Sequence, residues 1–357
     1  MDRVMPLHRQ GMSAHLRMAA VLAAAIVAAL VSSVPGSAAQ AADRVRVAMP
    51  TEGFLYTPLY LAIDAGFMKE EGIDPELIQF RGGGAAIGGL ASGSVEFCAC
   101  AIQNAINASV KGTGVTLIGT IIGQYASNVV LRGEVARRLN VGPGTPLDRR
   151  LAALRGLKIA GSGVGSSTDY LIRYLARKAN LSPERDFTVL FLAGGAPILA
   201  AFAQGRIDGL VFSSPTSDIA MVRYHGVLLL DMSRGELEDL RGYPSITLSA
   251  KRQFLTAKPG VAERFLRALA KGDRLIRDRP AEAKALLRKR FADVLADAFS
   301  AAWDANVSAY PANPRMDEGS VTRAIAFLGV VTGSTIPGAA RDYFDNTFAD
   351  AAMRGLQ

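Results

Sequence analysis

Residues 154–178, with the sequence LRGLKIAGSGVGSSTDYLIRYLARK, decide the fold of this chain. The apolar run at residues 157–160 predicts a buried strand, and the apolar spacing of residues 167–180 predicts a helix. Between them lies a turn with three glycines in five positions, which lets the backbone reverse direction. A strand, a glycine-rich turn and a helix in this order form the repeating unit of a sheet that is covered by helices.

The same order recurs on both sides of this stretch. Upstream, apolar runs predict strands at residues 44–49, 75–80, 95–101, 115–122 and 128–131, with helices at residues 58–71, 85–91 and 103–111. Downstream, they predict strands at residues 187–192, 209–212, 227–231 and 245–249, with helices at residues 197–204 and 216–224. A break rich in glycine and proline separates the two parts at residues 140–150, and the chain is almost wholly helical from residue 259 onward. The alternation predicts an α/β fold of two successive units, with mixed sheets flanked by helices and a helical C-terminal extension.

Two short turns suggest that the units are built alike. Residues 93–96 (GSVE) and residues 205–208 (GRID) each follow a predicted helix and precede a predicted strand. Glycine in that place is typical of a helix C-terminus, which favours a left-handed backbone. The alternative is that these are two unrelated helix ends.

The first 41 residues have the layout of an export signal. Three arginines face one acidic residue before residue 18, an apolar run follows at residues 18–34, and residues 39–41 (AQA) supply a small-residue cleavage site. The alternative is a membrane anchor, but the run is short for a span. We therefore expect cleavage near Ala41, a mature chain that begins at Ala42 in the periplasm, and no stable membrane insertion after processing.

The composition excludes several classes of function. The formal charge of +8 falls to about +6 once the net +2 of the first 41 residues is subtracted, and the basic residues are scattered, so nucleic-acid binding is not expected. Only His225 lies outside the signal, which argues against a Ser-His-Asp triad and excludes a multi-histidine metal site. We expect no catalytic residues, no metal and no cofactor.

Cys98 and Cys100 are the only cysteines and lie two residues apart on a predicted strand. This spacing places both on one face, with parallel side chains and with Cα atoms near the upper limit for a disulfide. We expect two small, buried core residues; the alternative is a redox pair.

Candidate ligand-binding residues follow from the sheets, because ligands of open α/β sheets bind beyond the carboxyl ends of the strands. The turn at residues 161–168 superficially matches a dinucleotide fingerprint, with Ser166 in place of the third glycine, but export argues against a nucleotide. Free N–H groups at its helix start favour a carboxylate, sulfonate or hydroxyl ligand; the alternative is that Ser166 or Ser167 only caps the helix. Residues 82–84 (GGG) offer the same geometry in the first unit. Together the strand ends give the candidates Phe54, Tyr56, Thr57, Gly83, Gly84, Gln103, Asn104, Tyr125, Gly165, Ser166, Ser167, Thr168, Gly195, Ser213 and Ser214.

Four basic residues recur at helical spacing in the C-terminal part: Arg264, Arg267, Lys271 and Arg274. We expect a solvated helix face; the alternative is a docking surface for a partner protein.

Five motifs in a fixed order resemble the substrate-binding proteins of nitrate/sulfonate/taurine-type ABC transporters, and the related pyrimidine-precursor synthases of thiamine biosynthesis. They are residues 58–62 (PLYLA) with 66–72 (GFMKEEG), 82–84 (GGG), 93–97 (GSVEF), 154–160 (LRGLKIA) leading to 165–167 (GSS), and 201–209 (AFAQGRIDG). The likeness covers residues 44–255.

The resemblance implies a type II periplasmic binding protein fold of two lobes that close on a ligand. Residues 42–131 would begin the first lobe, 132–240 would form the second, and 241–357 would return to the first with the C-terminal helices. Hinges would lie near residues 131–133 and 241–245. It implies a monomeric solute-binding protein that delivers a small organic ligand, expected to be anionic, to an ABC permease. Alternatives are a sensory module that presents its ligand to a membrane receptor, or an enzyme like the pyrimidine synthases.

This chain departs from the family pattern in ways that bear on the ligand. Many relatives have an acid where this chain has Ser214, before Pro215, so a taurine-like ligand with an ammonium group is not expected. Arg81 is the only arginine in the candidate loops, so a bare inorganic anion would lack charge pairing. The resemblance therefore points to an aromatic or aliphatic organic acid.

Overall fold

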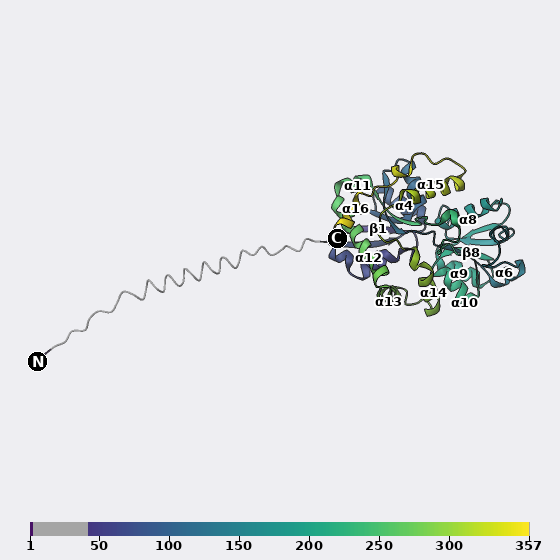
Figure 1. Cartoon of the computed structure of the whole chain (residues 1–357), viewed down its shortest axis with the longest axis horizontal. Helices are drawn as coiled ribbons and strands as arrows, with labels where there is room; N and C mark the ends of the chain where they lie inside the picture. Colours follow the sequence, from purple (N-terminus) through teal and green to yellow (C-terminus); the bar gives the residue numbers. More distant parts are fainter. Residues whose placement is uncertain (3–41, 357) are drawn as a thin grey trace. The chain divides into compact units, whose positions relative to one another are not determined.

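A computed structural model describes residues 1–2 and 42–356, and residues 42–356 lie within one compact unit (Figure 1). The predicted signal sequence and its cleavage site lie outside the described residues. Within the described part, no helix combines the length and apolar character needed to span a bilayer.

The first sheet has five strands in the order β2-β1-β3-β10-β4. Strands β1 and β2 are parallel, as are β1 and β3, whereas β10 runs antiparallel to both of its neighbours. The last strand in sequence, β10, therefore lies between β3 and β4, which come much earlier in the chain. The strands are β1 (Asp43–Met49), β2 (Ile73–Gln79), β3 (Phe97–Ala101), β4 (Val115–Ile122) and β10 (Ile246–Lys251).

The second sheet repeats this arrangement, with the order β7-β6-β8-β5-β9. Its first three strands are parallel, and its fourth, β5, is antiparallel to both neighbours, as β10 is in the first sheet. We call each sheet with the helices that cover it a lobe. The strands are β5 (Ser127–Leu131), β6 (Lys158–Gly161), β7 (Thr188–Phe191), β8 (Gly209–Ser213) and β9 (Val227–Leu230).

Helices cover both sheets, and the C-terminal third of the chain is helical as predicted (Figure 1). The first lobe has η1 (Phe54–Tyr56), α2 (Thr57–Asp64), α3 (Phe67–Glu70), α4 (Gly83–Ser92) and α5 (Ile102–Val110). The second has α6 (Gly133–Leu139), α7 (Leu147–Ala152), α8 (Ser167–Lys178), α9 (Gly195–Ala203) and α10 (Thr216–Tyr224). The rest are η2 (Glu238–Leu240), α11 (Arg252–Ala257), α12 (Pro259–Asp278), α13 (Pro280–Arg290), α14 (Ala296–Asn306), η3 (Val307–Ala309), α15 (Glu318–Thr332), η4 (Ala340–Asp342) and α16 (Thr347–Arg354).

The chain crosses between the sheets twice. It leaves the first sheet after β4 and enters the second at β5, so the first crossing is residues 123–126, and the second is residues 231–245. The sequence had placed the strand at residues 128–131 in the first unit, but it pairs with β8 and β9. An apolar run shows that a strand is buried and does not show which sheet it joins. The lobe boundaries remain a proposal, with the first hinge moved from residues 131–133 to residues 123–126.

Aromatic packing ties the two crossings together. The rings of Tyr125, from the first crossing, and Tyr243, from the second, have centroids 4.8 Å apart. Phe327 of α15 packs on both of them and on Tyr174 of α8. Gln124 adds hydrogen bonds to the second crossing, donating to the carbonyls of Met232 and Leu240 at 3.1 Å. A C-terminal helix therefore stabilises the place where the lobes join.

The basic residues of α12 are not a solvated face, contrary to the prediction. Arg267 and Lys271 both pair with Glu71 at 2.8 Å, and Arg264 pairs with Asp43 at 2.5 Å. Burial works to raise the pKa of Glu71, but hydrogen bonds from these two cations outweigh it and lower that pKa. The spacing correctly predicted that these residues share one face of a helix. It could not predict that Asp43 and Glu71, which are distant in sequence, pair with that face.

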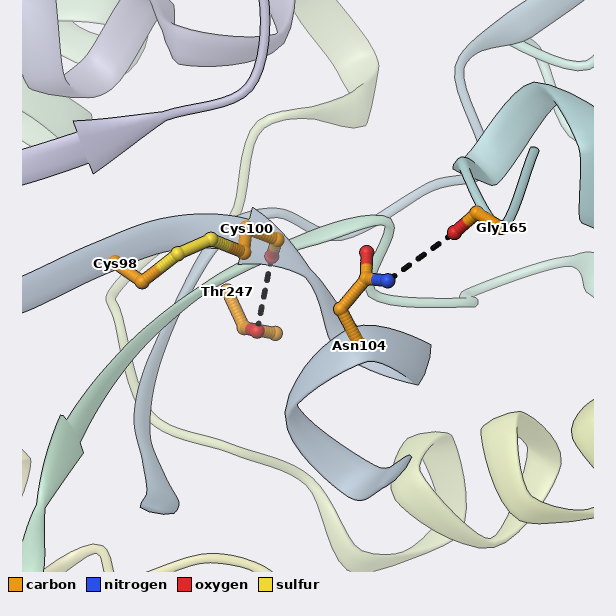
Figure 2. The surroundings of a disulfide bond; sticks show 5 residues. All are labelled: Cys98, Cys100, Asn104, Gly165 and Thr247. Carbon is orange, nitrogen blue, oxygen red and sulfur yellow. Dashed lines mark hydrogen bonds between the residues drawn. A yellow bond between two sulfur atoms is a disulfide. The ribbon is translucent and has the colours of Figure 1, made fainter. Parts of the chain in front are cut away.

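The cysteines are buried as predicted, on the same side of β3, but the prediction that they stay unpaired is wrong. The structure joins Cys98 and Cys100 in a disulfide (Figure 2). Their Cα atoms are 5.3 Å apart, within the range that a disulfide allows and shorter than two residues of an ideal extended strand would span.

Candidate ligand-binding site

A cavity of about 610 Å³ lies between the carboxyl ends of the strands of the two sheets. Residues of the first lobe form one wall: Pro50, Thr51, Gln79, Phe80, Arg81, Gly82, Gly84 and Ala85. Residues of the second lobe form the other: Ser162, Gly163, Val164, Ser166, Ala193 and Gly194. The cavity is large enough for a small organic molecule.

The first wall is built around the start of α4. Gly82 precedes this helix with φ 90° and ψ 167°, and no side chain caps it. Gly83 follows, and a Cβ at this position would overlap the side-chain amide of Asn104. The absence of a side chain on Gly83 thus allows Asn104, in the first turn of α5, to lie directly behind the wall.

The second wall has a matching element at the start of α9. Gly194 has φ 88° and ψ 168°, nearly the values of Gly82, and it too has no side-chain cap. A Cβ on the next residue, Gly195, would overlap the hydroxyl of Thr216 in the first turn of α10. Gly82-Gly83 and Gly194-Gly195 are therefore structural counterparts, which the sequence analysis had not recognised. It had instead matched the triple glycine at residues 82–84 to the turn at residues 161–168.

The turn before α8 satisfies its own backbone groups. Ser166 caps the helix by accepting from the Asp169 N–H at 3.2 Å, and the Asp169 carboxylate accepts from the Gly165 N–H at 2.8 Å. The Thr168 hydroxyl accepts from the Ser162 N–H at 2.8 Å. An anion at this turn would meet the Asp169 carboxylate, whose side chain is 5 % exposed and pairs with Arg173 at 2.8 Å. The capping alternative for Ser166 is thus the one that these contacts favour.

Several candidate residues join the two lobes directly. The Asn104 amide donates to the Gly165 carbonyl at 3.2 Å (Figure 2), and the Tyr125 hydroxyl donates to the Ser167 carbonyl at 2.5 Å. At another point the Phe54 N–H donates to the Ser214 carbonyl at 3.0 Å. The Ser214 hydroxyl accepts from Asn306 of α14 at 2.7 Å. The strand ends of both sheets therefore converge.

Other candidates are buried away from the cavity. Phe54 packs between Phe291 and Phe299, with ring centroids 5.0 and 5.3 Å away, in the core of the first lobe. Thr57 accepts a hydrogen bond from Tyr310 at 2.9 Å, and Tyr56 has its ring fully buried, which raises the pKa of its hydroxyl well above the usual value. Their position after β1 was read correctly, but the short helix η1 turns these side chains into the core.

Among the remaining candidates, Gly84 and Ser166 line the cavity, Gly83 and Gly195 lie one residue from it, and Gln103 and Ser213 are buried. Gln103 accepts a hydrogen bond from the Tyr243 hydroxyl at 3.0 Å. Ser213 is the end of β8, in register with Ser127. Which of these residues contact a ligand remains a prediction.

The list of candidates omitted Gln79 and Phe80, which line the cavity. Gln79 is the last residue of β2 and Phe80 follows it directly, whereas the candidates were chosen from the turn at residues 81–84. A phenylalanine directly after an edge strand, two residues before a glycine run, was the available signal for an aromatic side chain at the wall.

The cavity wall has one ionised group, Arg81, and contains no histidine, cysteine, lysine, acid or tyrosine. Asp218 lies in α10, the helix that begins at Thr216, and its buried side chain accepts from the Ser217 hydroxyl at 3.0 Å. Burial raises the pKa of Asp218 to about 6, so it is ionised at neutral pH. Within residues 42–356, no group of three or more histidine, cysteine or acidic side chains is arranged to hold a metal ion.

Two lobes of equal strand order, crossed twice by the chain and enclosing a cavity at their strand ends, define a periplasmic binding protein fold. A structure from Bordetella bronchiseptica RB50 shares this fold with a TM-score of 0.73, at 21% identity over 88% of this chain and 98% of that one. The alkanesulfonate-binding protein SsuA from Xanthomonas axonopodis pv. citri, bound to MOPS, is similar with a TM-score of 0.64, at 18% identity over 87% and 97%. The putative binding protein YtlA of Bacillus subtilis (strain 168) is 22% identical over 240 residues, which are 67% of this chain and 68% of that one.

The NMT1/THI5 like family matches residues 54–283, more than half of the chain. The chain belongs to this family. The family and the fold predicted from the five motifs are both confirmed.

Proposed function

We propose that this chain is a solute-binding protein that captures a small organic ligand between its two lobes and delivers it to an ABC permease. The observation that carries the proposal is the cavity whose walls come from the strand ends of both lobes. A ligand held there would contact both lobes at once, so binding would favour the closed arrangement over an open one. The names of similar proteins, an alkanesulfonate-binding protein among them, agree with this class.

The chemistry of the wall supports binding without catalysis. General acid–base catalysis needs a side chain that exchanges protons near neutral pH, and nucleophilic catalysis needs an activated hydroxyl, thiol, amine or carboxylate. Arg81 stays charged, and the wall offers no basic partner for Ser162 or Ser166. Export to the periplasm, a monomeric state and delivery to a permease belong to the same proposal.

A thermal-shift screen of residues 42–357 tests the binding function. Small acids, their amides, sulfonates, pyrimidines and aromatic compounds would be compared, since a ligand at 100 times its Kd adds about 2.7 kcal/mol to the free energy of unfolding. Small-angle X-ray scattering with each hit should show a more compact protein. If no compound raises Tm, the binding function fails; if a hit is released as a changed product, the chain is an enzyme.

Delivery is tested in cells. Deleting this chain should abolish uptake of the identified ligand, and restoring it should restore uptake. If uptake persists while a transcriptional response to the ligand is lost, the sensory alternative is correct.

A further inference from the structure

Two consecutive side-chain amides in the first turn of α5 have unused hydrogen-bonding atoms. Asn104 is 6 % exposed and its Oδ1 accepts no hydrogen bond from the described residues. Gln103, the preceding residue, is fully buried and its Nε2 donates none within the same part of the chain. Leaving a buried polar atom unpaired is costly, so two such atoms of opposite type on consecutive residues point to a partner outside the described residues.

Asn104 lies where the two cavity walls meet. Its Oδ1 faces Gly83, between the wall residues Gly82 and Gly84, and its Nδ2 donates to Gly165, between the wall residues Val164 and Ser166 (Figure 2). Opening the lobes would break the contact with Gly165 and uncover the whole amide. A ligand that enters the open cleft would therefore meet this side chain at its inner end.

The unpaired oxygen of Asn104 constrains the charge of the ligand. A carboxylate or sulfonate only accepts hydrogen bonds, so it would leave Asn104 Oδ1 without a donor. The one cation of the wall, Arg81, is exposed to solvent. The backbone N–H groups at the starts of α4 and α9 can donate to a neutral carbonyl oxygen as well as to an anion.

We infer that the ligand is uncharged and carries an amide-type group, such as a carboxamide, lactam or urea, whose N–H donates to Asn104 Oδ1 and whose carbonyl accepts from Gln103 Nε2. This rests on the proposed function and replaces the organic acid expected from the sequence. The aromatic wall residue Phe80 is placed to contact an apolar part of the same ligand.

Matched pairs of compounds test the charge directly. Nicotinamide and nicotinate, benzamide and benzoate, and valeramide and valerate differ only in the group in question. Titration calorimetry of residues 42–357 should give a Kd for at least one amide that is about tenfold or more below that of its acid. Tighter binding of the acids would overturn the inference and leave the proposed function standing. If neither member of any pair gave measurable binding in the calorimeter, the inference would also be overturned. The proposed function would then be judged by the wider thermal-shift screen.

Asn107 supplies a control within the same helix. It lies one turn further along α5, and its Nδ2 also reaches the second lobe, donating to the Tyr170 hydroxyl at 3.0 Å. Asn104→Ala should weaken binding of the amide about tenfold or more, whereas Asn107→Ala should change it less than about twofold. Equal losses would show that Asn104 acts only by holding the lobes together. Gln103→Glu, which keeps the acceptor for Tyr243 but removes the donor, should weaken binding as Asn104→Ala does.

Discussion

The two lobes have the same strand order and the same glycine pair at the cavity wall, yet the side chains behind those glycines differ. Behind Gly83 lies the amide of Asn104, which reaches across to the second lobe. Behind Gly195 lies the hydroxyl of Thr216. Two residues further along, the first lobe has Ile106 and the second has Asp218, both buried. The two lobes thus share a backbone arrangement but differ in the side chain behind the second glycine, which is an amide in the first lobe and a hydroxyl in the second.

This difference indicates that the lobes divide their tasks. The backbone angles of Gly82 and Gly194 are almost identical, so both lobes offer N–H groups at a helix start. Recognition of the rest of the ligand must then come from the side chains that differ. The following substitutions separate the contribution of each lobe.

The largest effect is expected from Asp218→Asn. Burial raises the pKa of Asp218 from its ordinary 3.8 to about 6. Because the folded pKa lies above the unfolded one, the carboxyl favours folding when protonated, and this stability is lost as the pH rises from about 4 through about 6. The cost at pH 7 is about 3 kcal/mol, at 1.36 kcal/mol for each pH unit of difference. The variant should therefore be more stable than the parent at pH 7 by up to that amount and similar to it below pH 4.

Urea unfolding at pH 4, 5, 6 and 7 measures this prediction. Ile106, at the matching position of the first lobe, has no ionisable group, so that position contributes no pH dependence. A variant that is less stable than the parent at pH 7 would show that the ionised carboxylate makes favourable contacts, and the lobes would then differ by a functional charge.

Smaller effects are expected from an alanine at each of the paired glycines. Gly83→Ala and Gly195→Ala should each lower the free energy of unfolding by about 1–3 kcal/mol, because the new Cβ overlaps a buried side chain. Gly163→Ala is the control, since a Cβ there meets nothing within 4 Å. If the first lobe recognises the ligand through Asn104, only Gly83→Ala should also abolish binding. Equal losses of affinity in both variants, measured by titration calorimetry, would remove the distinction between the lobes.

The smallest effect is expected from Ser166→Ala at the start of α8. Loss of a helix cap costs about 1 kcal/mol, and the remaining contact between Asp169 and the Gly165 N–H should preserve the turn. Ligand affinity should change less than about twofold, because Ser166 serves the helix. A large loss of affinity with unchanged stability would restore the anion site that the sequence analysis had considered at this turn.

The fold could be predicted from the sequence because its signals are local. Alternating apolar runs located nearly every strand, and the GSVE and GRID turns proved equivalent: each ends a helix and begins the third strand of its sheet. Their acids also act alike, since Glu96 accepts from the Arg46 N–H at 2.7 Å and Asp208 accepts from the Lys158 N–H at 2.8 Å. Local patterns were therefore enough to show that the units are alike.

The site could be predicted only in part, because it depends on pairings between distant segments. Residues 82–84 and 161–168 are both rich in glycine, and composition alone made them look like counterparts. The true counterpart, Gly194-Gly195, is recognised by the matching backbone angles and by the side chain that packs on the second glycine. The pairing of Cys98 with Cys100 and the inward turn of Phe54 were likewise missed, since each depends on a local backbone course that periodicity does not specify.

The late entry of β10 into the first sheet has a consequence for how the chain acquires its structure. This strand lies between β3 and β4 but follows the entire second lobe in sequence, and the aromatic cluster at the crossings is complete only when Phe327 is present. An emerging chain therefore cannot finish its first sheet until residue 251 has been made, nor secure the junction until more than nine-tenths of synthesis is over. Contacts of such long sequence separation form slowly. The first sheet of a chain arranged in this way stays incomplete through more than two-thirds of its synthesis, whereas the second sheet, which lies within residues 127–230, has all its strands before β10 is made.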